Sequence, residues 1–120
     1  DQGRMFGQRI SGYLYPPVTG SYTFFLAGDN FAELRLSRST DPYDAVIIAE
    51  VPEFTLVYEW DKYPSQRSIE IDLEAGKPYY IEAIATNGAD YDHVAVAWQI
   101  PESTLTSVIE GRYLEPVSRD

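Results

Sequence analysis

The feature that most constrains this chain is the alternation of apolar and polar residues along most of its length. In residues 8–15, Ile10, Gly12 and Leu14 alternate with more polar neighbours, and residues 67–73 alternate in the same way. A period of two is what a β-strand with one buried face requires, whereas an amphipathic helix repeats every ~3.6 residues. The pattern therefore predicts an all-β chain with little helix.

Turn residues separate the alternating stretches at intervals of roughly 8–15 residues. Expected strands cover residues 8–15, 22–27, 33–37, 45–51, 67–73, 79–85 and 93–99, with one more from 104–114. We expect the second and third of these to pair through a turn at residues 28–30, and those at 67–73 and 79–85 to form a hairpin. Residues 53–64 alternate little and are rich in aromatics, which indicates a long ordered loop.

Short strands at this spacing are typical of an antiparallel β-sandwich, jelly-roll-like in type, or of a barrel. A chain of 120 residues buries roughly two-thirds of its unfolded surface, which is enough for one core. No internal repeat or linker divides the sequence. We therefore expect a single all-β sandwich domain over residues 1–120.

The composition excludes several partners. The chain has 9 Lys and Arg against 19 Asp and Glu, a net charge of −10, so it has no basic stripe for nucleic acid or anionic lipid. Apolar runs such as residues 45–49 are far shorter than the ~20 residues that cross a bilayer, so no membrane insertion is expected. The absence of cysteine removes thiol catalysis, cysteine zinc sites and disulfides.

Catalytic signatures are missing from the sequence. It has no G-x-S-x-G elbow and no glycine-rich phosphate loop. The single histidine, His93, lacks a second histidine with which to hold zinc and is interpreted as structural or solvent-facing. Carboxylate pairs are too common in so acidic a chain to mark general acid and base catalysis. We expect no enzymatic activity, and a hydrolase is the third and weakest of the function classes.

Two polar segments are candidates for cation binding. Asp29 and Asn30 follow the strand at residues 22–27, and the segment before His93 carries Asn87, Asp90 and Asp92. Calcium takes six to eight oxygen ligands, which neither segment supplies alone but two loops at one end of a sandwich could. The alternative interpretation is a plain Asp-Asn turn and a solvated polar loop.

Ten tyrosines and two tryptophans are more than a small core easily hides. Exposed aromatic rings beside oxygen acceptors are what a sugar requires, because sugars present apolar faces and hydroxyl edges. The aromatics in predicted loops are Tyr43, Trp60, Tyr63 and Tyr91. Those on predicted strand faces, which we assign to the core, are Tyr22, Phe24 and Trp98.

Four sequence blocks, taken together and in order, resemble the protective-antigen fourteen-kilodalton domain family: residues 22–37, 59–66, 73–83 and 92–101. The family's hallmark is a strand that ends in an Asp-Asp pair and is followed by a strand of the form x-L-x-L. Here the pair falls on Asp29 and Asn30, and Leu34 and Leu36 follow. The resemblance covers about residues 7–116.

The resemblance implies a β-sandwich that commonly serves as a carbohydrate-binding module in bacterial toxins, secreted glycosidases, adhesins and flocculins. It also implies a calcium ion that takes sugar hydroxyls. Carried onto this chain, its ligands are Asp29, Asn30, Asn87, Asp90 and Asp92. Asn30 keeps an oxygen ligand but removes a charge, so calcium affinity is expected to fall.

The sugar contacts expected with that ion are Asp29, Asn30, Asp92, Tyr91 and, on the same ring, Trp60 or Tyr63. The sequence before Gly12 is shorter than in the family, so the domain either lacks N-terminal strand sequence or is a minimal sandwich.

The resulting hypothesis is a non-catalytic, calcium-assisted glycan-binding module of an extracellular or cell-surface adhesin or polysaccharide-degrading enzyme. Its partners are expected to be glycans or polysaccharides and the neighbouring domains of its parent protein. The competing hypothesis is a structural spacer or protein-interaction sandwich without sugar or calcium binding. Asn30 and the short N-terminal portion favour that alternative.

Overall fold

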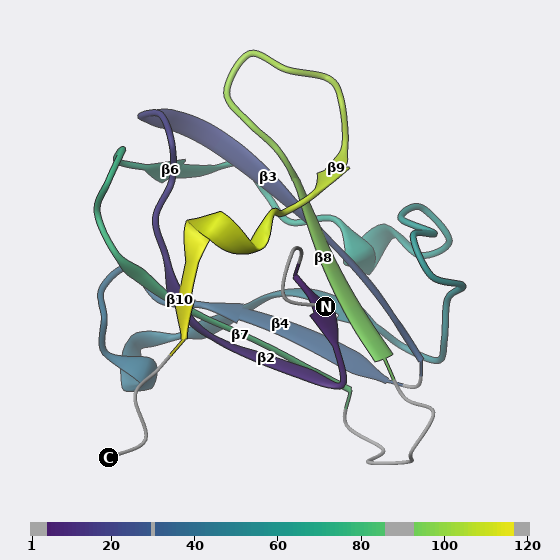
Figure 1. Ribbon diagram of the computed structural model, residues 1–120. Helices are drawn as coiled ribbons and strands as arrows, with labels where there is room; N and C mark the ends of the chain where they lie inside the picture. Colours follow the sequence, from purple (N-terminus) through teal and green to yellow (C-terminus); the bar gives the residue numbers. More distant parts are fainter. Residues whose placement is uncertain (1–4, 30, 86–92, 117–120) are drawn as a thin grey trace.

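Two antiparallel five-stranded sheets face each other in the computed structural model, which describes residues 5–29, 31–85 and 93–116 (Figure 1). Sheet one has the order β1 (Phe6–Gly7), β8 (His93–Gln99), β3 (Gly20–Asp29) and β6 (Ile71–Leu73), with β9 (Ser107–Val108) paired to β8. Sheet two has the order β10 (Leu114–Pro116), β2 (Arg9–Leu14), β7 (Tyr79–Ala85), β4 (Ala32–Leu36) and β5 (Val46–Val51). The predicted all-β antiparallel sandwich is confirmed.

Helical structure in the described residues is limited to three short 3₁₀ turns: η1 (Pro42–Asp44), η2 (Pro64–Gln66) and η3 (Gly111–Tyr113). Proline begins η1 and η2, where its missing N–H is no loss. A search of the described residues for a helix long and apolar enough to cross a membrane finds none.

The core lies between the sheets and is built by alternate residues of the central strands. Tyr22, Phe24 and Trp98 are almost fully buried, with the Trp98 ring centroid 5.1 Å from Tyr22 and 6.1 Å from Phe24. Val94 and Val96 of β8 point to the same side as Trp98 and join this cluster. The assignment of these aromatics to the core is confirmed, because alternate residues of a strand share one face and this face of β3 and β8 is turned toward sheet two.

The expected pairing of the two strands around residues 28–30 is wrong. β3 pairs with β8 and β6 in sheet one, whereas β4 pairs with β7 and β5 in sheet two. The chain crosses from one sheet to the other after Asp29 instead of folding back beside β3. A turn signature marks a reversal of direction, but it does not say which sheet the chain enters next.

The expected hairpin between residues 67–73 and 79–85 is wrong for the same reason. β6 pairs with β3, while β7 lies between β2 and β4 in the opposite sheet. The first of these strands is also shorter than predicted, since only Ile71–Leu73 form a ladder. At the C-terminal end, residues 104–114 contribute to two short strands, β9 and β10, where one was expected.

Beyond β6, the edge of β3 that faces away from β8 is closed by backbone and side-chain groups together. The Thr55 and Ser68 N–H groups donate to the Gly28 and Phe24 carbonyls at 2.6 and 2.9 Å. Thr55 Oγ1 accepts from the Gly28 N–H at 3.0 Å, and Ser68 Oγ accepts from the Phe24 N–H at 2.8 Å. Between them, the Gln66 amide donates to the Leu26 carbonyl at 2.9 Å. Thr55, Gln66 and Ser68 are all buried polar residues, and their burial is tolerated because each is hydrogen-bonded.

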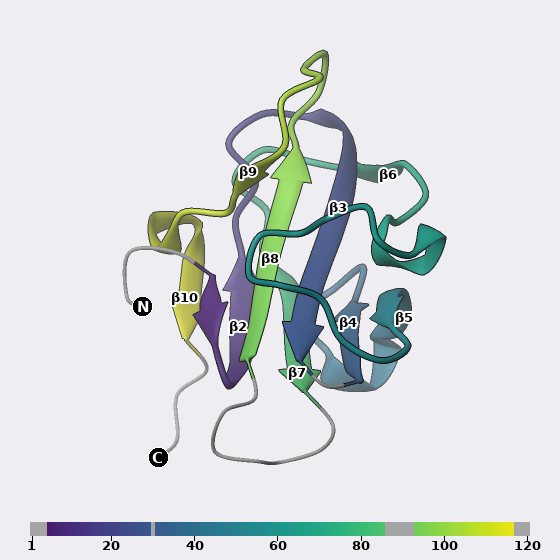
Figure 2. The same cartoon turned by 90° about the vertical axis from the view of Figure 1, so that its right-hand side faces the viewer.

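Because separate contacts replace a continuous strand here, the chain between Thr55 and Gln66 is free to leave the sheet. Figure 2 shows this teal segment passing across the faces of β3 and β8. Tyr58 in the segment contacts Phe6 of β1, on the far side of β8, at 6.2 Å between ring centroids. The predicted long loop packed by aromatics is therefore found, and it covers the outer face of sheet one.

We predict that Gln66→Leu lowers the free energy of unfolding by about 3 kcal/mol. The substitution removes two donated bonds, to Leu26 and Glu59, and one accepted from the Tyr63 N–H, and leaves buried backbone groups unpaired. Urea unfolding measures the loss. The neighbouring control is Ser65→Ala, which removes an exposed bond to the Glu50 carbonyl and should cost under about 1 kcal/mol. Equal effects of the two variants would contradict the role given to Gln66.

Candidate functional site

Asp29 is the last residue of β3 and lies on the outward face of sheet one. The register pairs Asp29 with His93, the first residue of β8, and an isolated bridge pairs it with Phe54 on its other side. The side chain is half-buried. Among the described residues, no hydrogen bond or ion pair is assigned to its carboxylate.

The backbone around Asp29 is held tightly. A Cβ atom at Gly28 would lie 2.6 Å from the Ala32 Cβ and 3.2 Å from the His93 carbonyl oxygen, so only glycine fits. Phe31 has a φ of 45°, a left-handed conformation that is uncommon for a bulky residue. Its N–H donates to the Glu53 carbonyl at 2.7 Å, which fixes the crossing between the sheets. The position of Asp29 is therefore set by local packing.

His93 is half-buried beside Asp29, and its ring stacks on Phe6 with 5.9 Å between centroids. Its Nε2 atom is buried and has no hydrogen-bond partner in the part of the chain that the structure describes. A buried polar atom without a partner is unfavourable, so its retention at this end of the sheet is unusual.

The two predicted loop aromatics, Trp60 and Tyr63, occupy different environments. Trp60 is half-buried and lies 6.1 Å from the Tyr58 ring, on the loop over sheet one. Tyr63 packs against the core, and the Lys62 ammonium lies 5.3 Å from its ring centroid. No ring contact joins Tyr63 to Trp60 among the described residues, and its role in sugar binding stays a prediction.

Five predicted site residues lie outside the described residues: Asn30, Asn87, Asp90, Tyr91 and Asp92. The predictions for them remain open. Tyr43, the other loop aromatic, is 97% exposed in η1. Among the described residues, no group of three or more His, Asp or Glu side chains is gathered as a metal site.

Sequence reasoning missed several aromatics that surround Asp29. Phe31 and Phe54 are both exposed. Phe31 lies two residues after Asp29 in the sequence, and Phe54 is the bridge partner of Asp29. Phe6 reaches the same end from β1. The position of Phe31 directly after the Asp-Asn pair was a usable signal, but Phe6 is far away in sequence and carried none.

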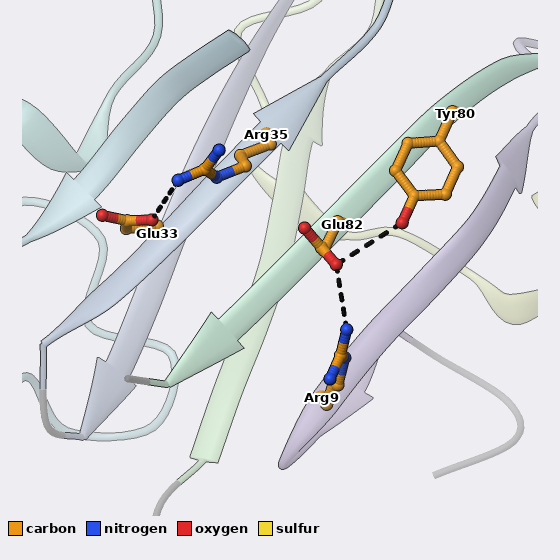
Figure 3. Close-up of polar contacts among 5 residues, drawn as sticks. All are labelled: Arg9, Glu33, Arg35, Tyr80 and Glu82. Atoms are coloured by element: carbon orange, nitrogen blue, oxygen red, sulfur yellow. Dashed lines mark hydrogen bonds and ion pairs between the residues drawn. The ribbon is translucent and has the colours of Figure 1, made fainter. Parts of the chain in front are cut away.

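The outer face of sheet two is a weaker candidate, because its charged groups pair with one another (Figure 3). Arg9 contacts Glu82 at 3.2 Å, and Arg35 contacts Glu33 at 3.0 Å. The Tyr80 hydroxyl donates to Glu82 at 3.4 Å. Burial, and then the nearby Glu82 charge, raise the pKa of Tyr80, so its hydroxyl stays neutral. The charged side chains named here are therefore already paired with one another.

A comparison with protein families decides the classification. The family model described as the GLEYA domain matches residues 6–99, which include β1 through β8 and Asp29. The chain belongs to the GLEYA domain family.

The curated relatives of this GLEYA domain are much longer proteins. Fibrocystin of Mus musculus is 29% identical over 120 residues, covering 94% of this chain and 3% of fibrocystin. N-acetyl-beta-glucosaminyl-glycoprotein 4-beta-N-acetylgalactosaminyltransferase 1 of Mus musculus is 33% identical over 99 residues, covering 78% of this chain and 10% of that enzyme. The chain therefore spans only a small part of each relative.

Solved structures share the fold of this GLEYA domain. The Epithelial Adhesin 6 A domain of Candida glabrata, solved in complex with Galβ1-3GlcNAc, has a TM-score of 0.61 and 16% identity. The match covers 91% of this chain and 50% of that one. The Epithelial Adhesin 9 A domain, solved with Galβ1-4GlcNAc, has a TM-score of 0.58 at 16% identity, covering 85% and 50%. At this identity the likeness is one of fold.

The resemblance to the protective-antigen family is therefore wrong as a family assignment. The residues that suggested it fall mostly within 6–99, but the family model that matches them is the GLEYA domain. A strand, an acidic turn and a second strand describe a β-sandwich corner, which is too general to separate two families. The metal and sugar ligands inferred from that resemblance need support of their own.

We predict that Gly28→Ala destabilises this GLEYA domain by about 1–3 kcal/mol, because the new methyl group overlaps Ala32. Thermal or urea unfolding measures the change. The double variant Gly28→Ala with Ala32→Gly removes the opposing Cβ and should recover part of the loss. Strictly additive effects of the two substitutions would show that this contact does not limit the corner.

Proposed function

We propose that this GLEYA domain is a non-catalytic, lectin-like module that binds glycans with the help of calcium. The observation that carries the proposal is the position of Asp29 at the end of β3, paired with His93 at the start of β8. Asn30 directly follows Asp29 in the sequence, and Asp92 directly precedes His93. Both polar segments therefore join sheet one at the same end of neighbouring strands.

The chemistry of these residues fits calcium. Carboxylate and amide oxygens are the ligands that calcium prefers, and the proposed set is Asp29, Asn30, Asn87, Asp90 and Asp92. The Asp29 carboxylate has no assigned partner among the described residues that would compete for it. Bound calcium supplies a Lewis-acidic centre for sugar hydroxyls. Asn30 in place of a second carboxylate lowers the charge of the set, so we expect modest affinity.

Membership of the GLEYA family and the fold of the two Candida glabrata adhesin domains support a sugar ligand. Both of those domains are in complex with galactose-containing disaccharides. We therefore propose galactosides as the first ligands to test. Contacts to the sugar at the metal come from Asp29, Asn30 and Asp92, with stacking by Tyr91. Trp60 lies farther along the loop and stacks on a more distant sugar ring, and Tyr63 packs beneath the loop that carries Trp60.

Binding at a shallow polar site buries little area, so affinity per site should be low and avidity should come from several copies or a multivalent ligand. The same family points to an extracellular or cell-surface location, in an adhesin or a polysaccharide-degrading protein. Neighbouring domains of the parent protein are proposed partners, because the curated relatives are many times longer than this chain.

The transferase relative does not make this chain an enzyme, since the match covers 10% of that protein. We keep the spacer or protein-interaction domain as the competing proposal. Asn30 favours this competing proposal, because an amide in place of a second carboxylate lowers the expected calcium affinity of the pair. Glycan and metal measurements on the same fragment separate the two proposals.

We predict that saturating calcium raises the thermal midpoint of the wild-type domain by about ten degrees, because a ligand at ~100 times its Kd adds ~2.7 kcal/mol. Asp29→Asn should abolish most of this shift and most of the binding to a galactoside array in calcium, because it removes the one charge in the described part of the site. Thermal unfolding across a calcium titration and the array are the two measurements.

The matched control is Glu70→Gln, which makes the same change at an exposed carboxylate beside β6. It should keep both the calcium shift and glycan binding. A calcium response without any array signal would favour a metal-bound spacer. No response to calcium and a blank array across plant, algal and host glycans would overturn the proposal.

A further inference from the structure

Four rings from three separate segments form a continuous row that starts beside Asp29. His93 stacks on Phe6 at 5.9 Å, Phe6 contacts Tyr58 at 6.2 Å, and Tyr58 contacts Trp60 at 6.1 Å. None of the four is fully buried, and Tyr58 is 42% exposed. The core aromatics Tyr22, Phe24 and Trp98 also contact one another, but they are hidden from solvent. The row is therefore a surface feature and not an extension of the core.

The loop that carries the row is held rigidly. The Glu59 N–H donates to the Leu56 carbonyl at 3.1 Å, and the Leu56 N–H donates to the Glu59 carboxylate at 2.9 Å. The Gln66 amide donates to the Glu59 carbonyl at 2.7 Å, which ties this turn to the edge of β3. Lys62 closes the loop by donating to the Phe54 carbonyl at 3.1 Å. Because these hydrogen bonds already order the loop, its aromatic rings lose little conformational entropy when a ligand binds.

Tyr58 is held in a strained conformation within this turn. Its φ is 64°, in the left-handed region that large side chains avoid. Tyr58 is the third residue of the turn that the Glu59 N–H closes on Leu56, and a type II β-turn needs a positive φ there, where glycine or asparagine is the usual choice. Strain of this kind tends to be retained where it presents a functional group. Here it places an exposed tyrosine ring between Phe6 and Trp60.

The row also starts at the proposed sugar site. His93 is the direct cross-strand partner of Asp29, and both face outward from sheet one with Phe6. A ligand held at Asp29 therefore has aromatic surface continuing away from it toward Trp60. Asp61, next to Trp60, is exposed and offers a hydroxyl acceptor at that end.

We propose that this row, residues His93, Phe6, Tyr58 and Trp60, is an extended subsite, and that the ligand is a linear oligosaccharide and not a single terminal sugar. The inference rests on the proposed function, because the terminal unit lies at Asp29. Successive sugar rings stack along the row by their apolar faces.

The test compares N-acetyllactosamine with its linear dimer and trimer, in calcium, by calorimetry on the wild-type fragment and its variants. Affinity should rise roughly tenfold from the disaccharide to the longest oligomer. Tyr58→Asn removes the ring while asparagine keeps the left-handed turn, and it should abolish that rise without changing disaccharide affinity. Tyr58→Phe should retain the rise, because stacking needs the ring.

The matched control is Tyr43→Asn, which deletes an exposed tyrosine outside the row. It should bind like the wild type, and thermal unfolding should show both asparagine variants folded. Asp29→Asn should weaken all lengths equally, which separates failure of the metal site from failure of the row. Equal affinity for all three lengths, no binding at any length, or an unchanged length dependence in Tyr58→Asn would overturn the extended subsite.

Discussion

The hydrogen bonds that close the outer edge of β3 determine much of this structure. A strand edge exposes unpaired N–H and C=O groups, and leaving them buried without partners is costly. Here Thr55 and Ser68 supply partners from both backbone and side chain, and Gln66 supplies one from its side chain. A paired strand would have to run straight along β3. These partners demand contact only at these points, so the chain between Thr55 and Gln66 can loop outward without breaking the edge.

At the centre of sheet one, the outward side chains beneath that loop are mostly small. Ala27, Ala95 and Ala97 face outward from the centre of sheet one and are fully buried. Because alanine projects one methyl group, the loop can lie close to the strands. At the end of the same strands, the outward residues become Asp29 and His93, which are half-buried. The boundary between covered and open sheet therefore coincides with the candidate site.

Period-two alternation was enough to predict the sandwich and its core, because burial of one strand face depends on local sequence alone. The position of Asp29 at the end of a strand was also predicted from sequence, since the turn residues that follow the strand are visible in the chain. The pairing of β3 with β8 and the placement of β6 and β7 in opposite sheets were not predictable in this way. They depend on which edges are already occupied, and Gln66 in particular fills its role through contacts 40 residues away. The aromatic row was hidden for the same reason, because Phe6 and Tyr58 meet only in the folded chain.

In the proposed site, the residue that fixes the backbone and the residue assigned to the ligand are different. Gly28 is confined by Ala32 and the His93 backbone, and so its identity is fixed by packing. The Asp29 carboxylate, one residue on, has no assigned contact among the described residues, and its identity is set by no packing requirement that the structure shows. Since the corner geometry depends on Gly28 and the edge depends on Gln66, substitutions at Asp29 can alter ligand chemistry while the sandwich stays intact.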